Sequence, residues 1–430
     1  MQPSNRNLVR NCFPTVLCLV VVAVCFACHA ADKSQPTQPH RTAIRYADLF
    51  ELLDFDRELR LTPGGRGYLR EWVTDDRDQE RRRNDLYYER SSVPRGTYFA
   101  LVIDEQRTPQ LRALGLRMLS PGDEGLDLAL LRRLLHSNNH TIRLETVRTL
   151  QTSSLAGVDG LLRSVASDER NDDNLRAEAV MGLARHVNKL QNREILLKLA
   201  ASTSRAVQIE SLRTLRRLAT ENADVKAELL SLTNRFFPRT EKKEADLSAK
   251  RRELATLFVL ALDNVPQHLR HVENIARPRS LTEWQDRLAT GGDPDAGRRV
   301  FFHAKGAQCS RCHSHRSRGG TVASDLSDMG RAMSRAKFIE AIVEPSREIP
   351  TNYTNWTLVT SSGKVHTGRI LEERVGRIVL GTAEGREVEL VASDIRKRVA
   401  QNVSMMPKDL VAQMTVEEFR DLIAFLKSFP

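Results

Sequence analysis

Apolar residues recur with a helical period between about residues 105 and 235. Four similar segments follow one another at offsets of 31, 33 and 32 residues: Arg112–Leu119, Arg143–Leu150, Arg176–Leu183 and Gln208–Leu215. Each segment has apolar residues at its fifth and eighth positions, which fall on one face of a helix. Second apolar runs lie between the segments, as from Leu126 to Leu135 and from Val158 to Val165. Because a lone helix pair cannot bury its apolar face, the pattern predicts pairs stacked into a solenoid.

The repeat resembles HEAT-like repeats, although its period is somewhat short for that type. An ordinary helical bundle is the alternative interpretation. We assign the repeats and their connecting helices to residues 105–277, before Pro278 and the turn at Gly291–Pro294. Residues 32–104 contain a helix-like run of leucines and an exposed Arg/Asp-rich stretch, and we assign them no function.

The hydrophobic period changes from helical to alternating after residue 353. Four runs alternate in character, with Gly363, Gly376 and Gly385 at the turns between them: Trp356–Thr360, Val365–Leu371, Arg377–Leu380 and Glu387–Val391. Alternation with glycine turns is typical of strands. The pattern predicts a small curled β-sheet inserted at about residues 353–399, bonded within itself and joined to its surroundings at its two ends.

The N-terminal segment has the pattern of an export signal. Arg6 and Arg10 precede an apolar run from Cys12 to Ala31, which small residues close. We predict a signal peptide over residues 1–31 and a mature protein in the periplasm or cell envelope. The run is also about 20 residues long, the length that spans a bilayer, so an uncleaved anchor is the alternative. Membrane contact is expected only if this segment is retained.

Charge favours acidic partners over nucleic acid. The formal net charge is +11, but the basic runs lie among many acidic residues and lack interleaved aromatics. We therefore interpret Arg81–Arg83, Arg251–Arg252 and Arg396–Arg398 as solvated faces and expect no nucleic-acid partner.

Candidate chemistry lies at two cysteines. Of six cysteines, four lie in the export segment, which leaves Cys309 and Cys312, followed at once by His313. This is the attachment motif of c-type haem. Two thiols one turn apart can each bond one haem vinyl group, and the next histidine then reaches the iron. The motif predicts one covalent haem c, with His313 as the proximal ligand of the iron.

Other readings of these cysteines are weaker. A zinc knuckle would need further ligands such as His313 and His315 in awkward adjacent geometry. A redox dithiol would need a thioredoxin-like βαβ setting, which the pattern lacks. A second match, Cys25–His29, lies within the apolar export segment, and we interpret it as coincidence.

The sixth ligand is predicted to be a methionine near the C-terminal end. Met406 precedes Pro407, and a helix capped by Thr415 and Glu418 follows. A thioether opposite histidine favours reduced iron. Met405 is the alternative distal ligand; less attractive candidates are Met329, Met333, His303, His315 and His366.

Two helices are expected to cross beside the motif, as in a small cytochrome c. The first covers Asp295–Phe302, and the last carries an apolar stripe of Phe419, Leu422, Ile423 and Leu426. We predict that Gly297 contacts Phe425. The expected fold is mainly α: a HEAT-like helical solenoid followed by a class I-type cytochrome c domain over residues 278–430, with the small β-sheet insertion.

Residues 278–430 resemble the planctomycete/verrucomicrobial-type haem-binding domain. The ordered matches are Asp295–Phe302, Cys309–His313, Arg318–Gly320, Asp325–Ser327, Glu344–Ser346 and Ser404–Pro407. In that family the domain commonly follows HEAT-like repeats and often a β-propeller of sugar-dehydrogenase type. Two departures matter: Ala323-Ser324 stands where the family has Gly-Pro before Asp-Leu, and no propeller fits before residue 105. The resemblance therefore implies haem binding without dehydrogenase activity.

These observations predict an electron-transfer protein, with a haem module on a helical scaffold. Its partners would be acidic redox proteins, including a separate dehydrogenase. A haem-containing oxidoreductase or peroxidase-like enzyme is the alternative, although a dihaem peroxidase needs two attachment motifs in the mature chain. A scaffold or sensor with a structural haem is the third reading. A ligated Met406 favours electron transfer, whereas an open sixth position favours catalysis or sensing.

Overall fold

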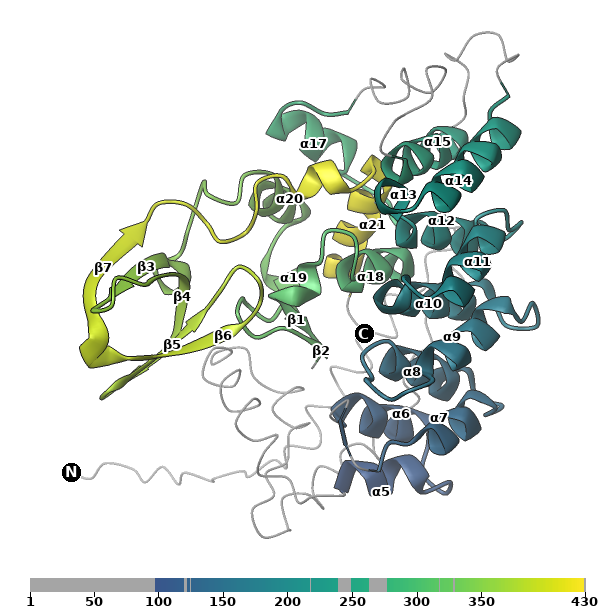
Figure 1. Cartoon of the computed structure of the whole chain (residues 1–430), viewed down its shortest axis with the longest axis horizontal. Helices are drawn as coiled ribbons and strands as arrows, with labels where there is room; N and C mark the ends of the chain where they lie inside the picture. Colours follow the sequence, from purple (N-terminus) through teal and green to yellow (C-terminus); the bar gives the residue numbers. More distant parts are fainter. Residues whose placement is uncertain are drawn as a thin grey trace, which may run out of the picture. The chain divides into compact units, whose positions relative to one another are not determined.

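The chain is mainly helical, with a small antiparallel sheet in its C-terminal third (Figure 1). A computed structural model describes residues 97–428, apart from 120–121, 124, 217, 239–248, 263–276, 317 and 328. The predicted signal peptide with its Cys25–His29 motif, and residues 32–96, lie outside the described residues. Among the helices that are described, none combines the length and the apolar character needed to cross a bilayer.

The helices between residues 97 and 262, the first part of the described chain, form two rows (Figure 1). The inner row packs side by side in the order α6 (Pro109–Met118), α8 (His140–Leu150), α10 (Asp173–Leu183), α12 (Arg205–Thr214) and α15 (Ala249–Ala261). The outer row consists of α7 (Leu128–Leu135), α9 (Val158–Ser167), α11 (Leu190–Leu199) and α14 (Ala223–Phe236), each packed on an inner helix. Shorter elements complete this part: α5 (Thr97–Ile103), η1 (Ala184–His186) and α13 (Leu218–Glu221).

The four repeated segments form helices, as predicted, and these helices all belong to the inner row; Leu119 and Leu215 are the C-caps of α6 and α12. The fifth and eighth residues of each segment are buried; Val147, Leu150, Val180 and Leu183 have no exposed surface. The helices begin where polar caps allow, because Asn139 and Asp172 accept backbone N–H groups at the starts of α8 and α10. One apolar core then continues through all the pairs, from Val102 to Leu262.

A second group of helices builds the C-terminal part. It comprises α17 (Leu281–Arg287), α18 (Pro294–Phe302), α19 (Met329–Ala332), α20 (Arg335–Val343) and α21 (Val416–Lys427). The predicted contact is confirmed: a methyl group on Gly297 of α18 would overlap the Asp421 carbonyl of α21 and lie 2.8 Å from Phe425 Cβ. The predicted capping box at Thr415 and Glu418 is confirmed as well. The predicted apolar stripe of α21 is buried in the core of this part.

The sheet contains β3 (Asn355–Thr360), β4 (Val365–Arg374), β5 (Arg377–Gly381), β6 (Glu387–Val391) and β7 (Ile395–Gln401), in the order β6-β5-β4-β3-β7. Four strands were predicted, and their three turn glycines have φ of +80°, +79° and +73°. The fifth strand, β7, was not predicted. Its central residues Arg396 to Ala400 are all exposed, so this edge strand has no alternation of buried and polar residues to reveal it.

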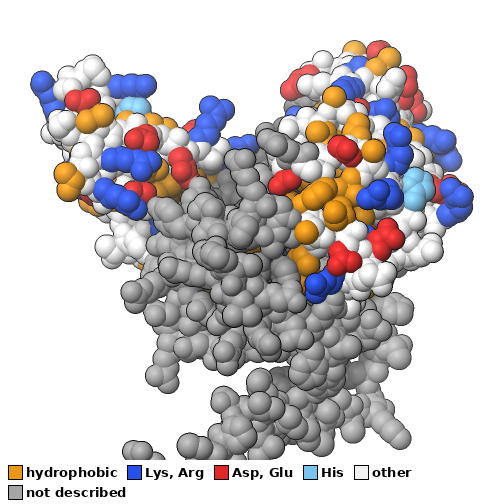
Figure 2. Space-filling view, turned by 90° about the horizontal axis from the view of Figure 1, so that it is seen from below, with side chains coloured by type: hydrophobic (Ala, Val, Ile, Leu, Met, Phe, Trp, Pro, Cys, Tyr) orange, Lys and Arg blue, Asp and Glu red, His pale blue; other side chains and the backbone are white. Residues whose placement is uncertain are grey.

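Short elements connect these units: η5 (Thr351–Tyr353), η6 (Ala392–Asp394), η7 (Leu410–Gln413) and a hairpin of β1 (Ser314–His315) and β2 (Arg318–Gly319). On the face that Figure 2 shows, Lys and Arg side chains are interspersed with Asp and Glu. Exposed pairs on the sheet include Arg377 with Glu389 and Arg398 with Glu373.

Candidate functional site

The two cysteines and His313 lie on one tight turn. Cys309 opens η4 (Cys309–Arg311), and its carbonyl accepts the N–H groups of Cys312 at 3.2 Å and His313 at 3.0 Å. The turn begins after Gln308, whose φ is +56°. Neither thiol is in a disulfide. The three residues of the predicted attachment motif are therefore brought together within a single helical turn.

The surroundings of Cys309 are apolar. Cys309 packs against the core of the C-terminal helices, as do the half-buried side chains of Phe302, Leu326, Met329, Met333 and Met406. Burial raises the pKa of the Cys309 thiol to about 12 and also raises the pKa of Cys312. A redox dithiol requires a lowered thiol pKa, so this environment argues against that alternative.

His313 is oriented by a backbone carbonyl. Its Nδ1–H donates to the Ser324 carbonyl oxygen at 2.9 Å. The Ser324 hydroxyl oxygen lies farther from the same nitrogen, at 3.4 Å. Because the nearer group is a carbonyl, which only accepts, we assign the proton of the neutral ring to Nδ1 and the lone pair to Nε2. Ser324 stands where the resembled family has proline, yet its carbonyl still holds the ring. The departure noted in the sequence therefore leaves the hydrogen bond to His313 in place.

Two other candidate histidines are buried elsewhere. The His315 ring lies 4.4 Å from the Phe425 ring, centroid to centroid, and burial lowers its pKa to about 3. His303 has no exposed surface; its Nε2 lies 3.2 Å from Thr214 Oγ1, and its Nδ1 accepts the N–H of Lys305. His366 is half-buried on β4. Across the described residues, no three His, Cys, Asp or Glu side chains are grouped to hold a metal ion.

The predicted methionine loop is tied to a second motif of the resemblance. Ser346 Oγ accepts the N–H of Ser404 at 3.1 Å, and Ser404 Oγ accepts the N–H of Met406 at 3.1 Å. Met406 packs against the same apolar cluster as Cys309, and Met405 is half-buried. Met329 and Met333, which were judged less attractive, contact that cluster too.

Residues after the attachment turn pack backbone against backbone. A Cβ on Gly319, whose φ is +111°, would overlap the His313 carbonyl, and one on Gly320 would overlap the Arg311 carbonyl. Farther on, Asp325 Oδ2 accepts from Ser314 Oγ at 2.6 Å, and Ser327 Oγ accepts the N–H of Arg316 at 2.7 Å. These motif residues therefore fix the chain on both sides of His313.

The expectation that the sheet joins its surroundings only at its ends is wrong. Thr321 Oγ1 donates to Glu387 Oε1 of β6 at 3.0 Å. Arg369 of β4 donates to the Val322 carbonyl at 3.1 Å. Both loop residues lie between the attachment turn and Ser324. Sequence alternation reveals which residues form strands, but it does not reveal what the finished sheet packs against.

Sequence reasoning also missed a row of buried glutamates, which we call the glutamate row. It consists of Glu145, Glu178 and Glu210, the third residue of three of the repeated segments. Each forms an ion pair with an arginine of the C-terminal part: Glu145 with Arg318 at 2.7 Å, Glu178 with Arg298 at 2.6 Å and Glu210 with Arg299 at 3.2 Å. The recurrence of Glu at one position of the repeat was a signal that could have found them.

Burial and the surrounding arginines have opposite effects on the pKa values of the glutamate row. Burial alone would raise the pKa of Glu178, but Arg298, Arg148 and Arg299 outweigh burial and lower that pKa to about 2. Glu418 of α21 has the same balance, with Arg216 and Arg213 lowering its pKa to about 2. For Glu210 burial prevails, and its pKa is raised.

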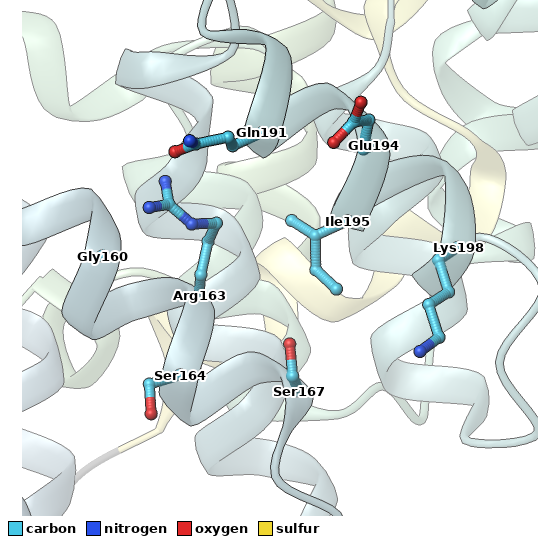
Figure 3. Close-up of a pocket in the computed structure, with 8 residues that line it drawn as sticks. All are labelled: Gly160, Arg163, Ser164, Ser167, Gln191, Glu194, Ile195 and Lys198. Carbon is cyan, nitrogen blue, oxygen red and sulfur yellow. The ribbon is translucent and has the colours of Figure 1, made fainter.

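A surface groove lies apart from these residues. It runs between α9 and α11 and is lined by Gly160, Arg163, Ser164, Ser167, Gln191, Glu194, Ile195 and Lys198 (Figure 3). Arg163 within it bonds Asp159 at 2.7 Å. None of the predicted site residues contributes to this groove.

The chain matches no protein-family model, and no curated protein matches its sequence. The features of the chain that indicate a function are therefore the attachment turn, the carbonyl that orients His313 and the methionine loop.

Proposed function

We propose that this chain is an exported electron-transfer protein that carries one haem c. Cys309 and Cys312 would hold the haem covalently, His313 would bind the iron, and Met406 would be the opposite ligand. One observation carries the proposal: both thiols and His313 share one helical turn, and Nδ1–H of His313 is bound to a backbone carbonyl. That hydrogen bond leaves Nε2 as the nitrogen with the lone pair, which suits it to bind a metal.

The residues present fit such a group. Two thiols outside any disulfide meet the requirement for covalent attachment, and the apolar cluster beside Cys309 suits the macrocycle. Bound there, haem c would supply reversible exchange of one electron. The chain would orient the His313 ring through Ser324, hold Met406 through Ser404 and exclude water with Phe302 and Leu326.

The rest of the chain fits a supporting role. We infer that the two rows of helices are a HEAT-like solenoid that carries the cytochrome c domain. The N-terminal pattern supports export to the periplasm or cell envelope, where haem c is attached. The net charge of +11 favours an acidic redox partner, with a separate dehydrogenase as electron donor.

Attachment is tested by producing the full chain with a c-type haem assembly system. The wild type should keep haem on the denatured polypeptide, and Cys309→Ala/Cys312→Ala should carry none. The matched control is Cys25→Ala/Cys28→Ala, which removes the other motif and should keep the haem. Haem that persists in the first variant and disappears in the control would overturn the assignment.

The distal ligand is tested by the near-infrared sulfur-to-iron band of the ferric protein. Met406→Ala should lose this band, and the neighbouring Met405→Ala should keep it. The reverse result would make Met405 the ligand. If neither variant loses the band, the source must be sought in Met329 or Met333, and the proposed role of Met406 fails.

The partner is tested by stopped-flow electron transfer across a salt series. Exchange with an acidic protein should slow as salt rises, because the Debye length shortens to about 8 Å at physiological ionic strength. Rates that do not depend on salt would contradict the proposed electrostatic attraction between this chain and its acidic partner. Sustained turnover of peroxide or sugar by the purified chain alone would contradict the carrier function.

A further inference from the structure

The position of the Ser324 carbonyl depends on a loop that has no proline. Ala323 and Ser324 both have ordinary backbone freedom, so the peptide groups around them must be fixed by their neighbours. Downstream, Asp325 bonds Ser314, and the Leu326 N–H donates to the Ser314 carbonyl at 2.9 Å. Upstream, the Ala323 N–H donates to the Cys312 carbonyl at 2.8 Å. The remaining upstream anchor is Val322, the residue that meets the sheet.

Arg369 of β4 holds the backbone of Val322. Its Nη1 donates to the Val322 carbonyl at 3.1 Å, and its Nε donates to the Asn352 carbonyl at 2.8 Å. The guanidinium carbon lies 4.2 Å from the centroid of the Tyr353 ring, which fixes the plane of the group. Arg369 therefore joins the segment that enters the sheet to the loop that carries Ser324.

The Val322 side chain is held by the next strand. It is 1% exposed, and a methyl group on Gly381 of β5 would lie 2.8 Å from its Cγ1. Thr321 is bonded to Glu387 of β6. Three adjacent strands thus contact two consecutive loop residues, both within three residues of Ser324.

We propose that Arg369 is a positioning residue for His313. By fixing the Val322 carbonyl, it sets the course of the next two residues and places the Ser324 carbonyl opposite His313 Nδ1. The predicted effect on the reduction potential of the iron rests on the proposed function, whereas the predicted effect on the His313 tautomer does not. The inserted sheet is then the element that sets the proton position on the His313 ring.

Loss of the Arg369 donors should loosen this carbonyl. An imidazole without a fixed acceptor at Nδ1 populates both tautomers, because the Nε2–H form that free histidine favours is then no longer suppressed. In the haem-loaded chain, a weaker Nδ1–H bond makes the histidine less basic. Ferric iron would be stabilised less, so the reduction potential should rise.

The test compares two arginines of the same strand. Arg369→Met keeps an unbranched side chain beside Tyr353 and removes the donors; Arg374→Met changes a β4 arginine that is 66% exposed and bonds Glu372. In the haem-free chain labelled with 15N-histidine, His313 of the wild type should be the Nδ1–H tautomer. Arg369→Met should show both tautomers and roughly tenfold faster exchange of the Ala323 amide. Arg374→Met should match the wild type in both measurements.

Two further variants keep the test decisive if Arg369→Met does not fold. Arg369→Lys retains one donor and should give an intermediate tautomer ratio. Gly381→Ala displaces Val322 from another strand and should shift the ratio in the same direction as Arg369→Met. An unchanged His313 tautomer in Arg369→Met, or in both of these variants, overturns the proposal.

The haem-loaded chain separates this proposal from the proposed function. There, Arg369→Met should have a higher reduction potential than both the wild type and Arg374→Met. If the wild type takes up no haem while the tautomer still responds to Arg369, the proposed function fails and the positioning role stands. If haem binds and neither the potential nor the tautomer responds, the positioning role fails alone.

Discussion

Helix α18 makes two contacts of opposite character. One side presents Gly297 and Phe301 to α21, where the backbones touch and the contact is apolar. The neighbouring Arg298 and Arg299 reach instead to the glutamate row of the repeats, where the contact is buried and ionic. The first contact depends on the absence of a side chain, and the second depends on charges that must all be matched.

The two contacts should therefore fail in different ways. Close packing tolerates no added atoms, so an added side chain disrupts it by steric overlap. Buried ion pairs contribute little net stability, but removal of one partner leaves an uncompensated charge. The apolar contact thus determines whether the C-terminal helices pack on one another. The ionic contact determines how these helices are positioned on the repeats.

The largest effect is expected for Gly297→Val. Its side chain would overlap the Asp421 carbonyl, so α18 and α21 would have to separate, at a cost above about 4 kcal/mol. Urea unfolding of the C-terminal part would measure it. The control is Gly160→Ala in α9, where the nearest atom is 3.7 Å away and the helix should gain up to about 1 kcal/mol. Equal stability of the two variants would contradict the close contact.

Removal of one glutamate comes next. Glu178→Ala leaves Arg298 buried without its main partner and should cost about 3–5 kcal/mol. The double variant Glu178→Leu/Arg298→Leu should cost less, because no charge is left unpaired. Glu194→Ala, at an exposed position of α11, should stay within about 0.5 kcal/mol of the wild type. A double variant that loses as much unfolding free energy as the two single variants together would contradict the ionic character of this contact.

A second buried ionic contact with the repeats, that of Glu418 of α21 with Arg213 and Arg216, should respond to acid. The pKa of Glu418 is lowered from 4.5 to about 2, so its contribution to stability is complete above pH 4.5 and is lost as pH falls toward 2. That contribution is on the order of 3 kcal/mol. Unfolding free energies across this pH range would show it as a steeper decline in the wild type than in Glu418→Gln. Parallel curves for the two proteins would mean that Glu418 has an ordinary pKa.

The smallest effect is expected at the cap of α21. Thr415→Ala removes the oxygen that accepts the Glu418 N–H, and should cost about 1 kcal/mol. Thr415→Ser keeps that oxygen and should recover most of the loss. Thermal unfolding of the two variants measures the difference. A cost as large as that of Gly297→Val would show that the cap contributes more than local helix stability.

Local sequence patterns predicted the helices and strands whose apolar residues recur at a regular spacing. The repeated segments, four of the five strands and the crossing of α18 with α21 could be read from apolar spacing, turn glycines and the pair Gly297 and Phe425. The grouping of Cys309, Cys312 and His313 also followed from sequence, because residues within one turn are necessarily close. Each of these features is set by residues near one another in the chain.

Features that depend on distant residues escaped prediction. Strand β7 is exposed on both faces, so burial left no pattern in its sequence. The hydrogen bond between Arg369 and Val322 joins residues far apart in the chain. Its acceptor is a backbone carbonyl, which is the same in every residue and so leaves no signal in the sequence. The sequence has Ala323-Ser324 where the resembled family has Gly-Pro, and the Ser324 carbonyl still supplies the acceptor for His313. The absence of a proline carries little information here, because the group that binds His313 is a backbone carbonyl, which every residue has.

The glutamate row also limits how the repeats can evolve. Successive repeats supply Glu145, Glu178 and Glu210 to three arginines whose spacing belongs to the C-terminal part. Helical arrays often change length by duplication or loss of a unit, because each unit contacts only its neighbours. Here an added pair between α8 and α12 would carry one glutamate out of register and leave an arginine unmatched. The number of helix pairs in this stretch is consequently fixed by a part of the chain that is not itself repeated.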